Sequence, residues 1–137
     1  IETYYLGTSH DKQALETAAR ENRGLVKSVK DDEVQQILAD MIKTTKMNDS
    51  SRLAGRVQEN LCRSSKKVNR NLKNLGVKEG PFYVLHGADM PSILVEVGFL
   101  TNQKEANMLS QPEYIYRLAS SIAEGIHKYL QDKGSSI

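Results

Sequence analysis

The segment Pro91–Asn102, which reads P-S-I-L-V-E-V-G-F-L-T-N, constrains the fold of this chain more than any other segment. Its β-branched and aliphatic residues predict a strand that is buried on both faces of a sheet. One carboxylate, Glu96, lies in the middle of the segment. An ionised carboxylate in an apolar interior is costly unless it is paired, hydrogen-bonded or facing a metal ion. Glu96 is therefore either part of a structural ion pair or a functional group.

The rest of the chain alternates predicted strands with amphipathic helices, a pattern that is typical of the α/β class. We predict strands over Glu2–Leu6, Pro81–His86 and Pro91–Asn102. We predict helices over Asp11–Glu21 and Asp31–Thr44, and a third helix that is capped within Asn48–Ser51 and extends to about Val68. Two further helices should begin at Asn102 and at Pro112. The polar segment Asn69–Gly80 should be a loop, and the wide apolar face of the last helix should lie against the sheet. Three strands are few for so many helices. We therefore expect further strands of the sheet upstream of Ile1.

Composition limits the classes of partner. A chain of 137 residues is expected to form one domain. Its net charge of +2 argues against a dedicated nucleic-acid binder, and no apolar run is long enough to span a membrane. The basic charge is nevertheless uneven, because six cations follow one another between Cys62 and Lys78 without an acidic residue: Arg63, Lys66, Lys67, Arg70, Lys73 and Lys78. We expect this basic run to face solvent. If it is functional, it could hold an anionic polymer.

The side chains that most often carry chemistry are few and scattered. Cys62 is the single cysteine, so it cannot form an internal disulfide, and we expect a packed, inert thiol. The histidines His10, His86 and His127 are too far apart for a close ligand motif. His86 could point into a cleft from the end of its predicted strand, although a structural role is the expectation. The chain by itself is therefore not expected to contain a complete metal site.

Glu96 remains the candidate for chemistry, because the chain has no G-x-S-x-G elbow and no phosphate-binding glycine loop. Strand alternation places Glu96 on the face that Leu94 and Gly98 share. Gly98 would leave space beside the carboxylate, toward the carboxyl end of the strand, where open α/β sheets place their sites. The residue pattern alone allows both a catalytic carboxylate and a salt-bridged structural one.

A family resemblance favours the catalytic interpretation. The chain resembles the zinc-dependent N-acetylmuramoyl-L-alanine amidases over nearly its whole length and in the right order. The matching segments are E-T-Y-Y-L at Glu2–Leu6, S-R-L-A at Ser51–Ala54 with Val57 and Gln58, G-V-K at Gly76–Lys78, F-Y-V-L at Phe82–Leu85, the block from Met90 to Asn102, and Glu105. The P-S-I-L-V-E-V-G-F-L-T-N block is the specific part of the match. The helices alone would be weak evidence.

The resemblance implies an α/β domain of the phosphorylase/hydrolase-like type, with a mixed sheet flanked by helices. It implies that residues 1–137 are the carboxyl-terminal part of a single catalytic domain that lacks its N-terminal strands in this chain. The family's zinc ligands, two histidines and a glutamate, would precede Ile1, so we expect no metal ligand here and an inactive isolated chain. Glu96 matches the family's catalytic carboxylate, the general acid and base that works on a zinc-activated water.

The implied substrate is peptidoglycan, cut at the amide bond between N-acetylmuramic acid and L-alanine, and the implied location is the cell envelope, periplasmic or extracellular. The chain departs from compact members of the family by a helical insertion at about residues 24–48. Longer members carry extra helical segments there that can cover the site until an activator protein binds. A surface embellishment is the simpler interpretation of the insertion.

Two other functions stay open at this stage. The fold could serve as a non-catalytic module that binds cell-wall glycan or a partner, for example through the basic run Arg63–Lys78. A small structural or interaction domain would also fit, provided that Glu96 is paired with a nearby Arg or Lys and closed off from solvent.

Overall fold

The computed structural model describes residues 1–23 and 44–135. Its elements, in chain order, are β1 (Glu2–Leu6), α1 (Lys12–Glu21), α3 (Thr44–Ser65), β2 (Gly76–Gly80), the 3-10 helix η1 (Tyr83–Leu85), β3 (Ile93–Glu96), α4 (Gln103–Leu109) and α5 (Pro112–Gly134). The helix that we predicted over Asp31–Thr44 lies outside the described residues, except for its last residue. The strand order in the sheet is β2-β1-β3, with β1 parallel to β2 and antiparallel to β3. The predicted α/β class and mixed sheet are confirmed.

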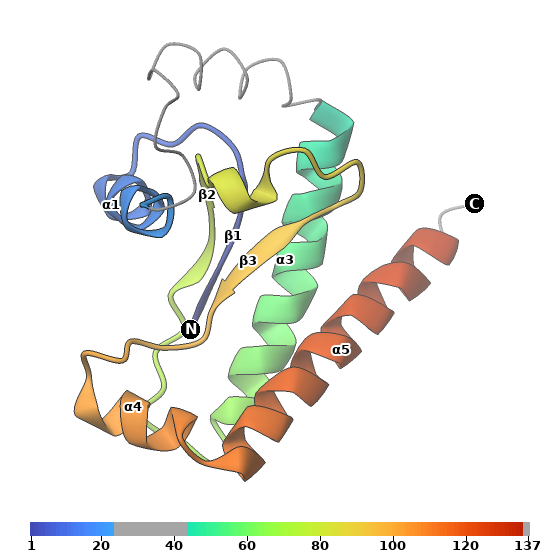
Figure 1. Ribbon diagram of the computed structural model, residues 1–137. Helices are drawn as coiled ribbons and strands as arrows, with labels where there is room; N and C mark the ends of the chain where they lie inside the picture. The colour runs from blue at the N-terminus through green and yellow to red at the C-terminus, as the bar shows by residue number, and fades with distance from the viewer. Residues whose placement is uncertain (24–43, 136–137) are drawn as a thin grey trace.

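Helices cover both faces of the sheet (Figure 1). The residues of β1 alternate between two apolar clusters. Tyr4 and Leu6 pack with Ala14 and Ala18 of α1. On the other face, Thr3 donates a hydrogen bond to Gln58 of α3, and Ile1, which directly precedes β1, joins the cluster of α3 and α5. Strand β1 is also the middle strand of the sheet. β1 is therefore the element that joins the two layers.

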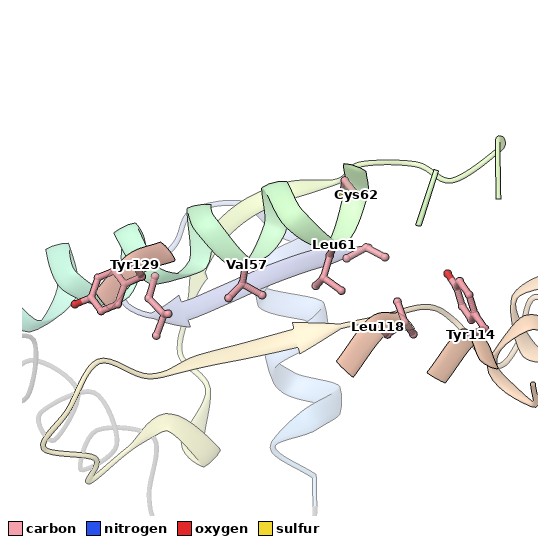
Figure 2. Close-up of a cluster of buried hydrophobic side chains, with 8 residues drawn as sticks. Val57, Leu61, Cys62, Tyr114, Leu118 and Tyr129 are labelled. Atoms are coloured by element: carbon pink, nitrogen blue, oxygen red, sulfur yellow. The ribbon is translucent and has the colours of Figure 1, made fainter. Parts of the chain in front are cut away.

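Helix α5 packs along α3, and not flat against the sheet as its wide apolar face had suggested (Figure 1). Figure 2 shows the cluster that joins the two helices, with Val57, Leu61 and Cys62 from α3 and Tyr114, Leu118 and Tyr129 from α5. The neighbouring stripe of α5 is exposed and contains Ile115, Ile126 and Leu130. The expectation that this whole face lies on the sheet is therefore wrong.

The second strand lies earlier in the sequence than predicted. Residues Gly76–Gly80, which we expected in a loop, form β2, and the predicted strand Pro81–His86 contains η1 instead. The apolar residues Phe82 and Leu85 led to the strand prediction. They are buried in the cluster on the α1 face of the sheet, but their backbone does not pair with a strand. The tertiary pairing with β1 gives the polar segment G-V-K-E-G its strand structure.

The third strand and the third helix also differ from the prediction. β3 has four residues, and each of them is only partly buried, so the expectation of a long strand buried on both faces is wrong. Helix α3 begins at Thr44, and the predicted caps Asn48–Ser51 lie inside it. Ser50 is buried there, and its Oγ accepts a hydrogen bond of 3.1 Å from the backbone N–H of Ser92.

Candidate functional site

Glu96 is the last residue of β3 and lies directly opposite Glu2 of β1 in the antiparallel register. Alternation along β3 puts Ile93, Val95 and Val97 in the α3 cluster and Leu94 in the α1 cluster. Glu96 therefore shares the α1 face with Leu94, as the sequence pattern predicted. This end of the sheet is where β1 and β2 begin and β3 ends (Figure 1).

The surroundings of Glu96 favour its protonated form. Partial burial raises the pKa of the Glu96 carboxyl above its usual value, because desolvation disfavours the charge. The nearby carboxylates of Glu21 and Glu2 raise this pKa further, Arg20 acts in the opposite direction, and a hydrogen bond with the Glu21 side chain adds to the increase. Glu96 forms no salt bridge with any described residue. Within that part of the chain, the ion pair that a purely structural role would require is not found.

The charge of Glu2 is compensated, unlike that of Glu96. Glu2 is buried, its Oε1 accepts a hydrogen bond of 2.8 Å from the Tyr4 hydroxyl, and its Oε2 lies 3.4 Å from the Lys78 ammonium. This pairing explains how a second carboxylate is tolerated beside Glu96. Glu2 is therefore a structural neighbour of Glu96 with its own cationic partner, whereas Glu96 forms no salt bridge with a described residue.

Helix α1 brings Arg20 and Glu21 to the site through its C-cap, Asn22. The Asn22 Nδ2 donates to the carbonyl of Pro81 at 2.9 Å, and its Oδ1 accepts from the N–H of Tyr83 at 2.9 Å. These two bonds fix the end of α1 to the segment that follows β2. Sequence analysis did not single out Arg20 and Glu21, because polar residues near the end of an amphipathic helix normally face solvent. No feature of the sequence alone distinguishes them.

Two grooves lie at this end of the molecule. One, of about 540 Å³, is lined on the α1 side by Glu2, Thr17 and Arg20, with Leu75 and Phe99 at its border. The other, of about 640 Å³, shares Leu75 and Phe99 and extends toward α4. Phe99, which the two linings share, follows Glu96 by three residues in the segment after β3.

The other candidate residues lie away from Glu96 or carry no site. His10, His86 and His127 are exposed, and His86 is not in the lining of either groove. Among residues 1–23 and 44–135, no three His, Cys, Asp or Glu side chains gather closely enough to hold a metal ion. Cys62 is buried, and burial raises the pKa of its thiol, as expected of a packed and unreactive cysteine.

The basic run from Arg63 to Lys78 covers the end of α3 and the segment that leads into β2. Arg63, Lys66, Lys67, Arg70 and Lys73 are exposed, as predicted, and Lys78 is half-buried beside Glu2. In the portion of the chain that the structure describes, no helix is long and apolar enough to cross a bilayer.

Comparisons with known proteins agree on one family. The family model for N-acetylmuramoyl-L-alanine amidases matches residues 1–128. The amidase AmiC of Neisseria meningitidis is 38% identical over 97 residues, which are 71% of this chain and 22% of the relative. The amidase AmiA of Escherichia coli is 31% identical over 114 residues, which are 83% of this chain and 38% of the relative.

A solved structure supports the same conclusion. The N-acetylmuramoyl-L-alanine amidase AmiC2 of Nostoc punctiforme superimposes with a TM-score of 0.52 at 39% identity, over 58% of this chain and 42% of the AmiC2 chain. The chain thus spans less than half the length of these relatives.

Proposed function

The chain belongs to the N-acetylmuramoyl-L-alanine amidase family, and we propose from this that the intact protein hydrolyses the amide bond between N-acetylmuramic acid and L-alanine in peptidoglycan. One structural observation supports the proposal most directly. Glu96, half-buried at the end of β3 and opposite Glu2, forms no salt bridge with a described residue and has a pKa above its usual value. A general base needs this combination of access and raised proton affinity.

In the proposed reaction, Glu96 takes a proton from the attacking water and then delivers it to the departing amine of L-alanine. The carboxylate must be ionised for the first step and protonated for the second. A pKa moved from the usual value of a glutamate toward neutrality serves both steps, because the correct starting form stays populated while the base becomes stronger. Arg20, which lowers this pKa, limits the shift.

Zinc is the proposed cofactor of the intact protein. The described residues do not fit a zinc site, because they gather no set of three ligands and their histidines are exposed. A zinc ion would therefore need ligands from outside the described residues, and the proposed role of Glu96 depends on its own environment. Elemental analysis of the purified intact protein checks this part of the proposal, with about one zinc per chain as the expected result. A fully active preparation without metal would contradict it.

The proposed place of action is the cell envelope, because peptidoglycan lies there, and the polymer itself is the proposed partner. The insertion at about residues 24–48 falls mostly outside the described residues. Its function as a cover that an activator protein removes therefore stays a prediction. Deletion of residues 31–44 from the intact enzyme should raise its basal activity if they form such a cover.

Glu96→Gln in the intact protein tests the catalytic assignment. The amide keeps the shape of the side chain but cannot accept the proton, so we expect the rate of muropeptide cleavage to fall by about 10²- to 10⁴-fold. Glu124→Gln is the matched control, because it removes a carboxylate that is exposed on α5 and paired with Lys128. Near-normal turnover by Glu96→Gln, with cleavage confirmed in the wild type, would refute the role of Glu96.

A further inference from the structure

Five cations gather where α3 ends, and we call them the basic cluster: Arg63, Lys66, Lys67, Arg70 and Arg117. The first four follow one another along the chain and are exposed. Arg117 is half-buried and comes from α5, which packs along α3 (Figure 1). Its guanidinium donates a hydrogen bond of 3.5 Å to the Ser64 hydroxyl on α3. The structure thus adds a cation from a distant part of the chain to the basic run of the sequence.

The backbone after α3 is ordered by hydrogen bonds of its own. The N–H of Asn69 donates to the carbonyl of Ser65 at 2.8 Å, and the N–H of Leu72 donates to the carbonyl of Asn69 at 3.1 Å. Further along, the N–H of Leu75 donates to the carbonyl of Ile1 at 2.9 Å. The cations that follow α3 are therefore placed by a folded segment that is bonded to the start of β1.

The basic cluster has no acidic partner in the described part of the chain. None of its five members forms a salt bridge there, and Arg63 and Arg117 bond the neutral side chains of Asn60 and Ser64. Glu59, one turn before Arg63, lies 3.4 Å from Arg56 instead. The net charge of the whole chain is only +2, so the rest of the protein is negative overall. The positive charge is thus concentrated on one surface.

Helix electrostatics explain only part of this concentration. A cation in the last turn of a helix is favoured by the macrodipole, and Arg63 occupies that position in α3. The effect falls off within one turn, so it does not account for Arg70. It gives Arg117 no advantage either, because this residue lies in the first half of α5. A surface that gathers like charges without compensation is better explained by an anionic partner.

The form of the surface indicates a polymer and not a small anion. The five cations are absent from the linings of the two grooves near Glu96. A single small anion on an open surface competes poorly with water, whereas a polyanion contacts several cations at once and releases its counterions. Three of the five members are arginines, whose planar guanidinium binds phosphate through two parallel hydrogen bonds. A chain of phosphodiesters therefore fits the cluster.

We propose that the basic cluster binds a phosphodiester polymer of the cell envelope, with poly(glycerol phosphate) as the simplest representative of this chemistry. This is a second binding activity, separate from the reaction at Glu96. The choice of an envelope polymer rests on the proposed place of action, whereas the need for a polyanion rests on the cluster itself. Bound polymer would hold the protein at the surface where its proposed substrate lies.

The test is a calorimetric titration of the intact protein with purified poly(glycerol phosphate) at several salt concentrations. We expect the logarithm of the association constant to fall linearly with the logarithm of the salt concentration, with a slope of about −3 for five cations. The triple variant Lys66→Gln, Lys67→Gln, Arg70→Gln should bind about 10-fold more weakly or worse, and its slope should be shallower by about 2.

Two further variants separate the cluster from net charge and from misfolding. Lys12→Gln, Arg52→Gln, Lys133→Gln removes the same charge from exposed positions outside the cluster, so its affinity should stay within about 2-fold of the wild type in physiological salt. Lys66→Arg with Lys67→Arg keeps the charge and should keep the affinity. Equal losses in the two triple variants, or no binding of the polymer at low salt, would overturn the inference.

The identity of the partner is tested with two other anionic probes. Tighter binding of anionic phospholipid vesicles, or of single-stranded DNA of the same charge, than of poly(glycerol phosphate) would also overturn the inference. None of these titrations involves cleavage of an amide bond. A protein that binds the polymer through the cluster but cleaves no muropeptide would therefore support this inference while it refutes the proposed function.

Discussion

Gly125 of α5 lies against Val57 of α3 so closely that a Cβ atom added to Gly125 would be 2.7 Å from the Cα of Val57. The same atom would be 3.1 Å from the carbonyl oxygen of Arg56. Both neighbours are backbone atoms of a helix, so neither can move without a shift of α3. Gly125 therefore sets the distance between the two helices.

Gly125→Ala should destabilise the protein because it forces α3 and α5 apart. We expect a loss of about 1–3 kcal/mol in the free energy of unfolding, measured by urea denaturation. Gly55→Ala is the matched control in α3, since a Cβ there meets no atom within 4 Å. It should stabilise the protein by about 0.5–1 kcal/mol through the higher helix propensity of alanine. Equal stability of the two variants would contradict the close packing.

Gln58 connects α3 to the start of β1 through a buried network. Its Oε1 accepts a hydrogen bond of 2.8 Å from the Thr3 hydroxyl, and its Nε2 donates to the carbonyl of Ile1 and to the Oδ1 of Asn74, each at 2.8 Å. Gln58→Ala should lower the free energy of unfolding by about 2–4 kcal/mol, because it leaves buried partners unsatisfied and removes packed atoms.

The control for Gln58 is Gln103→Ala, which removes an exposed hydrogen bond to Asn107 at the start of α4. This change should stay within about 0.5 kcal/mol of the wild type. Thermal unfolding followed by circular dichroism measures both variants. A small effect of Gln58→Ala would show that water replaces the network.

Glu96 should make stability depend on pH in the direction opposite to that of a salt-bridged carboxylate. Its folded-state pKa is raised, so the folded protein binds more protons than the unfolded chain between the two pKa values. Stability is then fully present below the unfolded pKa and falls as the pH rises through the folded pKa. Glu96→Gln removes this loss. Its melting temperature should exceed that of the wild type at pH 7, and the difference should shrink as the pH is lowered toward 4.

A second variant controls for the loss of one negative charge. Glu124→Gln removes an exposed carboxylate with a salt-bridge partner, so its melting temperature should not rise at pH 7. A Glu96→Gln protein that is less stable than the wild type at pH 7 would mean that the Glu96 carboxylate is stabilised by a cation after all.

Much of the fold could be predicted from local pattern. Strand β1 has the predicted bounds, and α1 matches the predicted helix Asp11–Glu21, with Asp11 as its N-cap, whose Oδ1 accepts from the N–H of Ala14 at 2.8 Å. These elements carry their own signals, β-branched and aromatic residues in one and a cap with helical spacing in the other. Helix α5 was likewise marked by Pro112 at its first turn.

The failures arose where tertiary contacts decide the structure. Strand β2 carries no strand signal of its own and depends on its pairing with β1. Asn48–Ser51 has the composition of a helix cap but lies inside α3. The hydroxyl of Ser50 instead accepts a hydrogen bond from Ser92, in the segment that leads into β3. In the site, Glu96 could be predicted because it breaks an apolar run. Its neighbours Arg20 and Glu21 could not, because tertiary contacts of α1, including the bonds of Asn22 to the Pro81–Tyr83 segment, bring them there.

The antiparallel pairing of Glu2 with Glu96 has a consequence for the order of folding. The two residues are far apart in the sequence, so their contact closes a very long loop. Pairings of such high sequence separation are expected to form slowly, after local elements such as helix α3 have formed. A chain still emerging during synthesis would carry α3 before Glu96 had a defined environment. The surroundings that raise the pKa of Glu96 would then be among the last features to form during folding.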